Sequence, residues 1–333
     1  MVVMGLKKVW ICMIGLFCSF VLSSCMNHKL DAISEKKDLI ISVNKKVGSL
    51  TFLNQINLKK ITDWNLNRDV SGAALLNNGK VIAVFHPEDP TIDLYQLSSG
   101  EKMNSWQSEK GITNMLSLNS KNMVAVSNGE ENTITFFSQK GKVVKKLKVG
   151  NNPTSMIEDP VHNKLFVSLF NEKRVVGINL DSLKIDQTIE VPLTSNGLYL
   201  NEESSELYIG GHGNGEVENE DVRIFSTVSG EFIKALHTPL MPISFFQNND
   251  GVFTIAHGTN QIYKLNPNLT NQKEFLEVGS NPYSAIGYQH TAYVASYDLN
   301  KLYEINTSTM KITKEAAVGR GPFQLLLREG NHQ

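Results

Sequence analysis

The chain has 333 residues, among them 32 Lys and Arg, 33 Asp and Glu and 3 Cys. A net charge of −1 provides no positive field for nucleic acid, which excludes DNA and RNA as expected partners. With 41% hydrophobic and 20% charged residues, the composition excludes both a disordered chain and a protein that crosses a membrane many times.

The first 24 residues have the pattern of a secretion signal. Lys7 and Lys8 precede an uncharged apolar run over residues 9–22, which is shorter than the ~20 residues of a membrane span. The run ends in Leu22-Ser23-Ser24-Cys25, which resembles the bacterial lipobox. In proteins with that box, the cysteine is joined to a diacylglyceryl group and becomes the first residue after cleavage. The resemblance implies a signal peptide over 1–24 and lipid on Cys25.

This interpretation accounts for every cysteine. Cys12 and Cys18 would leave with the signal peptide and Cys25 would carry lipid, so the mature chain would have no free thiol and no disulfide. Two acyl chains hold a protein stably at a bilayer. We therefore expect an outward-facing protein anchored to the cell membrane, or to the outer membrane where there are two, through a tether over 25–36. An ordinary cleaved signal, or an uncleaved anchor, is the alternative.

The remaining sequence is a repeat. A short apolar strand pattern recurs seven times, and the first five copies are 42 residues apart, the others 45 and 40; the second residues of the copies are at positions 40, 82, 124, 166, 208, 253 and 293. Alternating segments such as 91–95 and 301–305 follow the copies and indicate half-buried strands. A period of this length is typical of a four-stranded propeller blade. We predict an all-β fold, a single seven-bladed β-propeller of antiparallel blades over 37–330, with a tail over 331–333.

A second sequence pattern recurs at the junctions between copies. The segment Val149-Gly150-Asn151-Asn152-Pro153 recurs in the same form at 278–282 and at 318–322. This Gly-x-x-Pro junction, followed by strands and Ser/Thr-rich turns, resembles the YVTN-repeat family of β-propellers, with the closest copies at 163–191 and 293–318. The resemblance covers nearly all of the propeller region, although the tetrapeptide that names the family is absent.

The two ends of the repeat predict how the propeller closes. The first copy has no Gly-x-x-Pro strand before it, whereas the chain ends with a spare one over 322–327. We expect this C-terminal strand to complete the N-terminal blade, because closure removes exposed strand edges. Trp64 and Trp106, 42 residues apart, are expected to pack between blades.

Equivalent positions of the repeat indicate a binding rim. The fourth residue after each numbered position is expected at one rim of the funnel; these residues are Asn44, His86, Asn128, Phe170, His212, His257 and Tyr297. Three histidines in seven could bind a metal or orient an anionic ligand. Half-exposed loop histidines that bond to backbone are the alternative. Arg320, in the last junction, could hold an anion.

An insertion over 211–221 follows His212 and contains the carboxylates of Glu216 and Glu218, whose oxygens suit Ca²⁺. The spacing does not match an EF-hand loop, and a solvated acidic loop is the alternative. The candidate metal ligands are therefore His86, His212, His257, Glu216 and Glu218. No other cofactor is expected.

Three functions remain open. The first is a binding scaffold without catalysis, which takes an envelope protein, a peptide, a glycan or a small molecule at its funnel. The second is an enzyme similar to lactone hydrolases or streptogramin lyases, in which rim histidines act as acid and base or as metal ligands. The third is an accessory subunit of a quinoprotein-like redox assembly. We favour the first, because phosphate-binding, nucleophile-elbow and His-Glu-x-x-His motifs are absent.

Overall fold

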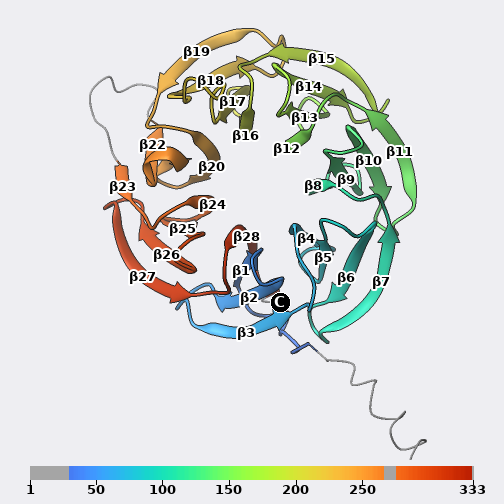
Figure 1. The fold of residues 1–333 in the computed structure, drawn as a ribbon, viewed down its shortest axis with the longest axis vertical. Helices are drawn as coiled ribbons and strands as arrows, with labels where there is room; N and C mark the ends of the chain where they lie inside the picture. The colour runs from blue at the N-terminus through green and yellow to red at the C-terminus, as the bar shows by residue number, and fades with distance from the viewer. Residues whose placement is uncertain (1–29, 266–274, 332–333) are drawn as a thin grey trace, which may run out of the picture.

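The computed structural model describes residues 30–265 and 275–331. Within these ranges the chain forms seven four-stranded antiparallel sheets arranged radially around an axis (Figure 1). Apart from the short 3-10 turn His257–Thr259, the regular elements of the described residues are strands, and none of them is a helix able to cross a membrane. The predicted all-β, seven-bladed propeller is confirmed.

We number the blades 1 to 7 along the chain and list the strands of each from the inside to the outside. Blades 1 to 4 comprise β28 (Pro322–Arg328), β1 (Leu39–Asn44), β2 (Ser49–Asn54), β3 (Lys60–Asn65); β4 (Gly72–Leu76), β5 (Val81–Phe85), β6 (Thr91–Gln96), β7 (Glu101–Gln107); β8 (Ile112–Leu118), β9 (Met123–Asn128), β10 (Thr133–Ser138), β11 (Val143–Lys148); and β12 (Pro153–Asp159), β13 (Lys164–Leu169), β14 (Arg174–Asn179), β15 (Lys184–Glu190).

Blades 5 to 7 comprise β16 (Ser195–Asn201), β17 (Glu206–Gly211), β18 (Asp221–Ser226), β19 (Phe232–His237); β20 (Pro242–Asn248), β21 (Gly251–Ala256), β22 (Gln261–Leu265), β23 (Phe275–Glu277); and β24 (Pro282–Tyr288), β25 (Thr291–Ser296), β26 (Lys301–Asn306), β27 (Lys311–Ala317). Because successive strands are antiparallel, the start of each inner strand and the end of each second strand lie at the same rim. We call this rim the upper rim and the opposite one the lower rim.

The C-terminal strand closes the propeller as predicted. β28 pairs with β1 in antiparallel register from Leu39 opposite Arg328 onward, so the two ends of the chain share blade 1. The guanidinium of Arg328 donates to the carbonyl oxygens of Ser34 and Lys37, both at 2.7 Å. The side-chain amide of Gln324 bonds both backbone groups of Ala73 in blade 2. Closure therefore also joins blade 1 to its neighbour.

The Gly-x-x-Pro junctions have a backbone conformation that explains their sequence. The residue before the proline is in the left-handed region in all three, with φ of 54° at Asn152, 60° at Asn281 and 69° at Gly321. Asn and Gly tolerate this region best, and proline is accepted as the first residue of a strand. The junction thus turns the chain sharply from an outer strand back to the next inner strand.

Aromatic side chains fill the space between blades. Trp64 on β3 lies 6.0 Å from Tyr95 of the next blade, and Trp106 on β7 stacks at 5.6 Å on Phe137 of the next. Both tryptophans are buried, which confirms their expected packing role. The second strands are buried almost throughout, because blades cover both of their faces.

We predict that removal of residues 322–333 prevents folding. Without β28, β1 becomes an open edge beside the axis and the buried Leu325 is lost, so the shortened protein should aggregate or lose cooperative unfolding in urea. A chain that ends at Asn331 is the control and should unfold like the full-length protein. A soluble, cooperatively unfolding chain without β28 would contradict the closure.

Candidate functional site

Six aromatic side chains form a continuous arc along the upper rim. They follow the second strands of blades 4 to 7 or occupy the second position of the inner strands β24 and β28. The centroid distances of neighbouring side chains are 5.6 Å for Phe170–His212, 6.2 Å for His212–His257, 4.6 Å for His257–Tyr283, 5.5 Å for Tyr283–Tyr297 and 5.0 Å for Tyr283–Phe323. All six are partly exposed, so they present a surface rather than a core.

Two lysines of blade 1 extend this surface. The ammonium of Lys45 lies 4.7 Å from the centroid of Phe323, and that of Lys46 lies 4.4 Å from the centroid of Tyr297. Their backbone N–H groups donate to the carbonyls of the last junction, at Gly321 and Arg320, which fixes the turn against β28. We call the six aromatic residues with Lys45 and Lys46 the aromatic arc.

His212 is a half-buried polar group of the arc. Burial, followed by the nearby His257, lowers the pKa of its imidazole, so the side chain is neutral near pH 7. Its Nδ1 atom is buried and has no hydrogen-bond partner among the described residues. A neutral imidazole with an unused nitrogen can accept from, or donate to, a group that enters the arc.

The rest of the upper rim is polar. Blades 2 to 4 enclose a shallow pocket of about 570 Å³; its polar lining residues include Glu88, Glu130, Asn132, Asn151, Asn152 and Asn171. Where blades 4 to 7 place an aromatic side chain after the second strand, blade 2 has Pro87 and blade 3 has Gly129. Because Pro87 and Gly129 are smaller than the aromatic residues of the other blades, they leave the space that forms the pocket.

The seven positions expected at one rim fall into two groups, because the register of the strands differs by one residue between blades 1 to 3 and blades 4 to 7. In blades 1 to 3, Asn44, His86 and Asn128 occupy the last paired position of the second strand or its equivalent, whereas Phe170, His212, His257 and Tyr297 are the first residues of the following turn. A shift of one residue turns a side chain to the other face of a sheet. The structure therefore brings four of the seven together, and Lys45 is their true counterpart in blade 1.

The other three positions are buried inside blades and brace the turns. The amide of Asn44 donates to Ser49 and Thr51 at 3.1 and 2.9 Å. Asn128 accepts from the backbone N–H of Glu131 at 2.8 Å. Both side chains have their partners within the protein, and both residues are almost inaccessible to solvent.

His86 belongs to a buried charged network. Its Nδ1 is 2.5 Å from the carbonyl oxygen of Asp69, and its Nε2 is 3.6 Å from the carboxylate of Asp93. Burial acts to raise the pKa of Asp93, but the nearby His86 imidazole together with Lys102 and Ser105 outweighs it and holds this pKa far below its usual range. The network is completed by Arg68, which lies 3.0 Å from the same carboxylate.

Of the five candidate metal ligands, only His212 and His257 lie next to each other. His86 is enclosed in its own network, and Glu216 and Glu218 are exposed on the insertion. In the described part of the chain, no group of three or more His, Cys, Asp or Glu side chains is placed to hold a metal ion. Arg320 is exposed in the junction beside Lys46, where it adds positive charge to the arc.

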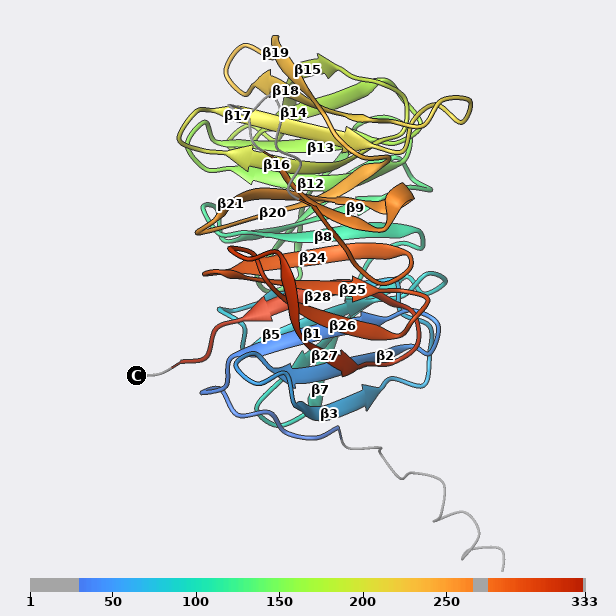
Figure 2. The same cartoon turned by 90° about the vertical axis from the view of Figure 1, so that its left-hand side faces the viewer.

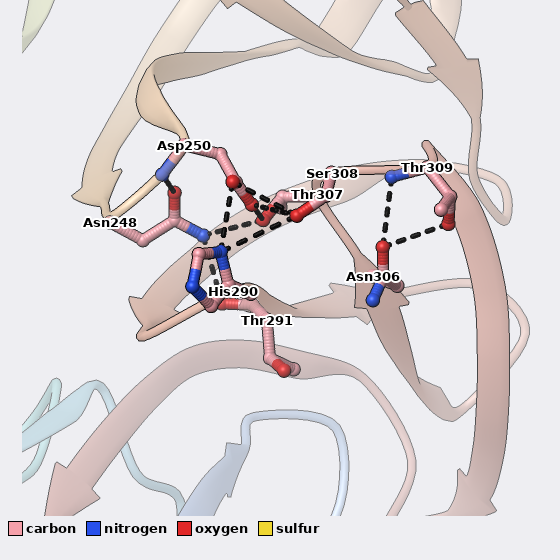
Figure 3. A network of polar contacts seen from close by, with 8 residues as sticks. All are labelled: Asn248, Asp250, His290, Thr291, Asn306, Thr307, Ser308 and Thr309. Atoms are coloured by element: carbon pink, nitrogen blue, oxygen red, sulfur yellow. Dashed lines mark hydrogen bonds and ion pairs between the residues drawn. The ribbon is translucent and has the colours of Figure 1, made fainter.

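A Ser, a His and an Asp meet at the lower rim, which sequence reasoning missed because they come from three separate turns (Figure 3). His290 Nδ1 lies 2.9 Å from Asp250, and Ser308 Oγ donates to both Asp250 oxygens at 2.9 Å. Ser308 is also 3.4 Å from the same Nδ1. A nucleophilic triad needs the two ring nitrogens for different partners, so this cluster lacks that geometry.

The lower-rim cluster clamps neighbouring blades together. Thr307 donates to Asp250 at 2.5 Å and accepts from Asn248 at 2.8 Å, which ties blade 6 to blade 7. Burial acts to raise the pKa of Asp250, but hydrogen bonds from Thr307, His290 and Ser308 lower it overall. His162 makes a matching contact between blades 4 and 5, since its Nδ1 lies 2.9 Å from Asp159 within blade 4 and 3.4 Å from the hydroxyl of Thr227 in blade 5.

No protein-family model and no curated protein matches the chain. Solved structures match its fold. A functionally unknown protein from Desulfotomaculum acetoxidans DSM 771 has a TM-score of 0.72 at 10% identity and covers 88% of this chain and 100% of its own. Kuenenia stuttgartiensis hydrazine synthase has 0.73 at 13%, with 86% and 99% covered. The dihydro-heme d1 dehydrogenase NirN, in complex with DHE, has 0.63 at 10%, with 91% and 77% covered. At these identities the likeness shows the propeller fold alone.

We predict that His212 makes stability fall in mild acid. Its folded pKa lies below the ordinary value of 6.5, so below that pH the unfolded chain takes up a proton that the folded chain does not. The substitution His212→Phe keeps an aromatic side chain and removes the titration. Urea unfolding at about pH 7.5 and about pH 5.5 should therefore show a smaller loss of stability in this variant than in the wild type. His237→Phe, on an exposed outer strand, is the control, and an equal loss in wild type and His212→Phe would refute the assignment.

Proposed function

We propose that this protein is an outward-facing lipoprotein, anchored through lipid on Cys25, whose propeller binds a protein, peptide, glycan or small ligand at the upper rim. The aromatic arc is the observation that carries the binding role. The Gly-x-x-Pro junctions and their left-handed Asn residues support assigning the blades to the YVTN-repeat type.

The contrast between the two rims supports a site at the upper one. Polar side chains of the lower rim bond one another across blades, as Asp250, His290 and Thr307 do. At the upper rim, six aromatic side chains and two lysines stay partly or fully exposed over adjoining blades. Aromatic side chains contribute large contact areas at low entropic cost, and lysines add attraction for anionic or electron-rich groups. Such a surface is typical of recognition sites.

The proposal of a lipid anchor is based on the amino-acid sequence alone. Cys25 and the signal peptide lie outside the described residues. Leu30, the first described residue, packs against the cluster between blades 1 and 2, and the N–H of Ile33 donates to Leu97 at 2.8 Å. A chain that leaves Cys25 thus joins the propeller at once, which suits a short tether better than a long linker.

A catalytic role is the second candidate, and His212 is the observation that favours it. A neutral imidazole beside a second histidine can take up a proton from a bound substrate. By analogy with the propeller folds of lactone hydrolases, streptogramin lyases or quinoprotein-like assemblies, a reaction would take place at the upper rim. A shared fold does not by itself imply a shared function.

We expect variants of the arc to lose ligand affinity. A panel of peptides, oligosaccharides and metabolites would be screened by thermal shift, and the hits titrated by calorimetry. Tyr283→Ala and Phe323→Ala should each weaken binding roughly 2- to 10-fold, since an aromatic contact contributes ~0.5–1.5 kcal/mol beyond its area. Phe232→Ala, which removes an exposed aromatic residue from outer strand β19, is the matched control. Hits that bind both arc variants as tightly as the wild type would place the site elsewhere.

A further inference from the structure

We propose that the propeller sits edge-on at the membrane, with its outer strands β7 and β11 facing an anionic bilayer surface. This inference rests on the proposed lipidation of Cys25. The face consists of Met103 on β7 and of the segment 140–148 that contains β11, and we call it the basic flank. The propeller axis then runs parallel to the bilayer.

The attachment point fixes which side of the propeller is near the lipid. Leu30 packs against the cluster between blades 1 and 2, and Asp31 bonds Thr62 at 2.5 Å and accepts from Trp64 at 3.0 Å, both on the outer strand β3 that Figure 1 shows at the circumference. Leu30 is the fifth residue after Cys25. Five extended residues span at most about 17 Å, so this edge cannot move far from the bilayer.

The flank next to this edge presents apolar side chains to solvent. Where β7 pairs with β6, the register shifts between Leu94 and Tyr95 of β6, which leaves Met103 of β7 as the bulged residue, 56% exposed. In β11 the same irregularity leaves Val144 bulged and 51% exposed, with Val143 beside it at 49%. A bulge directs the extra side chain away from the paired strand. Blades 2 and 3 therefore carry neighbouring apolar projections.

The same flank has a strong positive charge. Residues 140–148 include five lysines and no acid, namely Lys140, Lys142, Lys145, Lys146 and Lys148. Lys146 pairs with Glu109, but in the described ranges no carboxylate lies within ion-pair distance of Lys140, Lys142 or Lys145. Lysines beside apolar residues are the composition that binds an anionic lipid surface.

The outer strand β19, on the opposite side of the propeller, has the same bulge as β7 and β11 but no excess of positive charge. On β19 of blade 5 the bulged residue is Ile233, 45% exposed, at the position that Met103 and Val144 occupy in their blades. Its neighbours are Glu231 and Lys234, which cancel in charge. Figure 1 shows β19 across the propeller from β7. Ile233 is thus a matched control for a label on the basic flank.

In this edge-on orientation both rims of the propeller remain accessible to solvent. In the side view the turns that form the two rims lie on the left and right of the molecule, whereas the outer strands lie along its circumference (Figure 2). The aromatic arc then faces along the membrane, where it can meet another envelope protein or a ligand that diffuses at the surface.

The test uses the full lipidated protein and three single-cysteine variants, Met103→Cys, Val144→Cys and Ile233→Cys. Because Cys25 is acylated and Cys12 and Cys18 are removed, a maleimide dye reacts only at the new position. Each labelled protein is placed in vesicles of phosphatidylcholine with phosphatidylglycerol that contain a headgroup-bound quencher. We expect quenching several-fold greater at positions 103 and 144 than at 233, and a decrease at 144 when Lys142→Glu and Lys145→Glu are added or when salt is raised.

Equal quenching at the three positions, or the strongest quenching at position 233, would contradict the proposed edge-on orientation. Lysine variants that leave quenching at 144 unchanged would show that the basic flank does not contact anionic lipid. Mass spectrometry of the mature protein separates this failure from that of the proposed function. An unmodified Cys25 refutes the lipoprotein itself, whereas an acylated Cys25 with equal quenching refutes only the orientation.

Discussion

The pairing of β28 with β1 is the contact on which the rest of the structure depends. It joins residues almost 290 positions apart, from Leu39 opposite Arg328 to Val43 opposite Gln324, and thereby turns a row of seven blades into a closed propeller. Each blade then has a neighbour on both sides, so each second strand can be buried. Closure also holds the junction at Arg320 and Gly321 against Lys45 and Lys46, which completes one end of the aromatic arc.

The two rims use similar residue types for different purposes. At the lower rim, carboxylates, hydroxyls and imidazoles bond one another between blades, and the Asp250–His290–Ser308 cluster is such a clamp. At the upper rim, His212 keeps a buried nitrogen without a partner among the described residues, and the surrounding aromatic side chains stay partly exposed. Satisfied polar groups stabilise the fold, whereas the unpaired nitrogen of His212 offers a hydrogen-bonding partner to a ligand at the arc.

The sequence predicted the fold more completely than the site. The 42-residue spacing, the Gly-x-x-Pro junctions and the spare last strand each follow from local strand and turn chemistry, and the structure confirms seven blades and their closure. The same spacing concealed a shift of one residue between blades 3 and 4, which buries Asn128 and exposes Phe170. Tyr283 and Phe323 were missed because they sit on inner strands, and only the folded propeller brings these next to Tyr297 and Lys45. Aromatic residues one position after the junction prolines were the signal that could have found them.

The most direct test of a ligand site at the upper rim is histidine modification in the native envelope. Diethyl pyrocarbonate would be applied to cell-envelope membranes and to the purified protein, and the labelled histidines quantified by mass spectrometry. If the aromatic arc binds an envelope component, His257 is modified more slowly in the membranes, while His290, exposed at the lower rim, reacts equally in both. Equal reaction of His257 in both samples, with protection of His290 instead, would contradict the account.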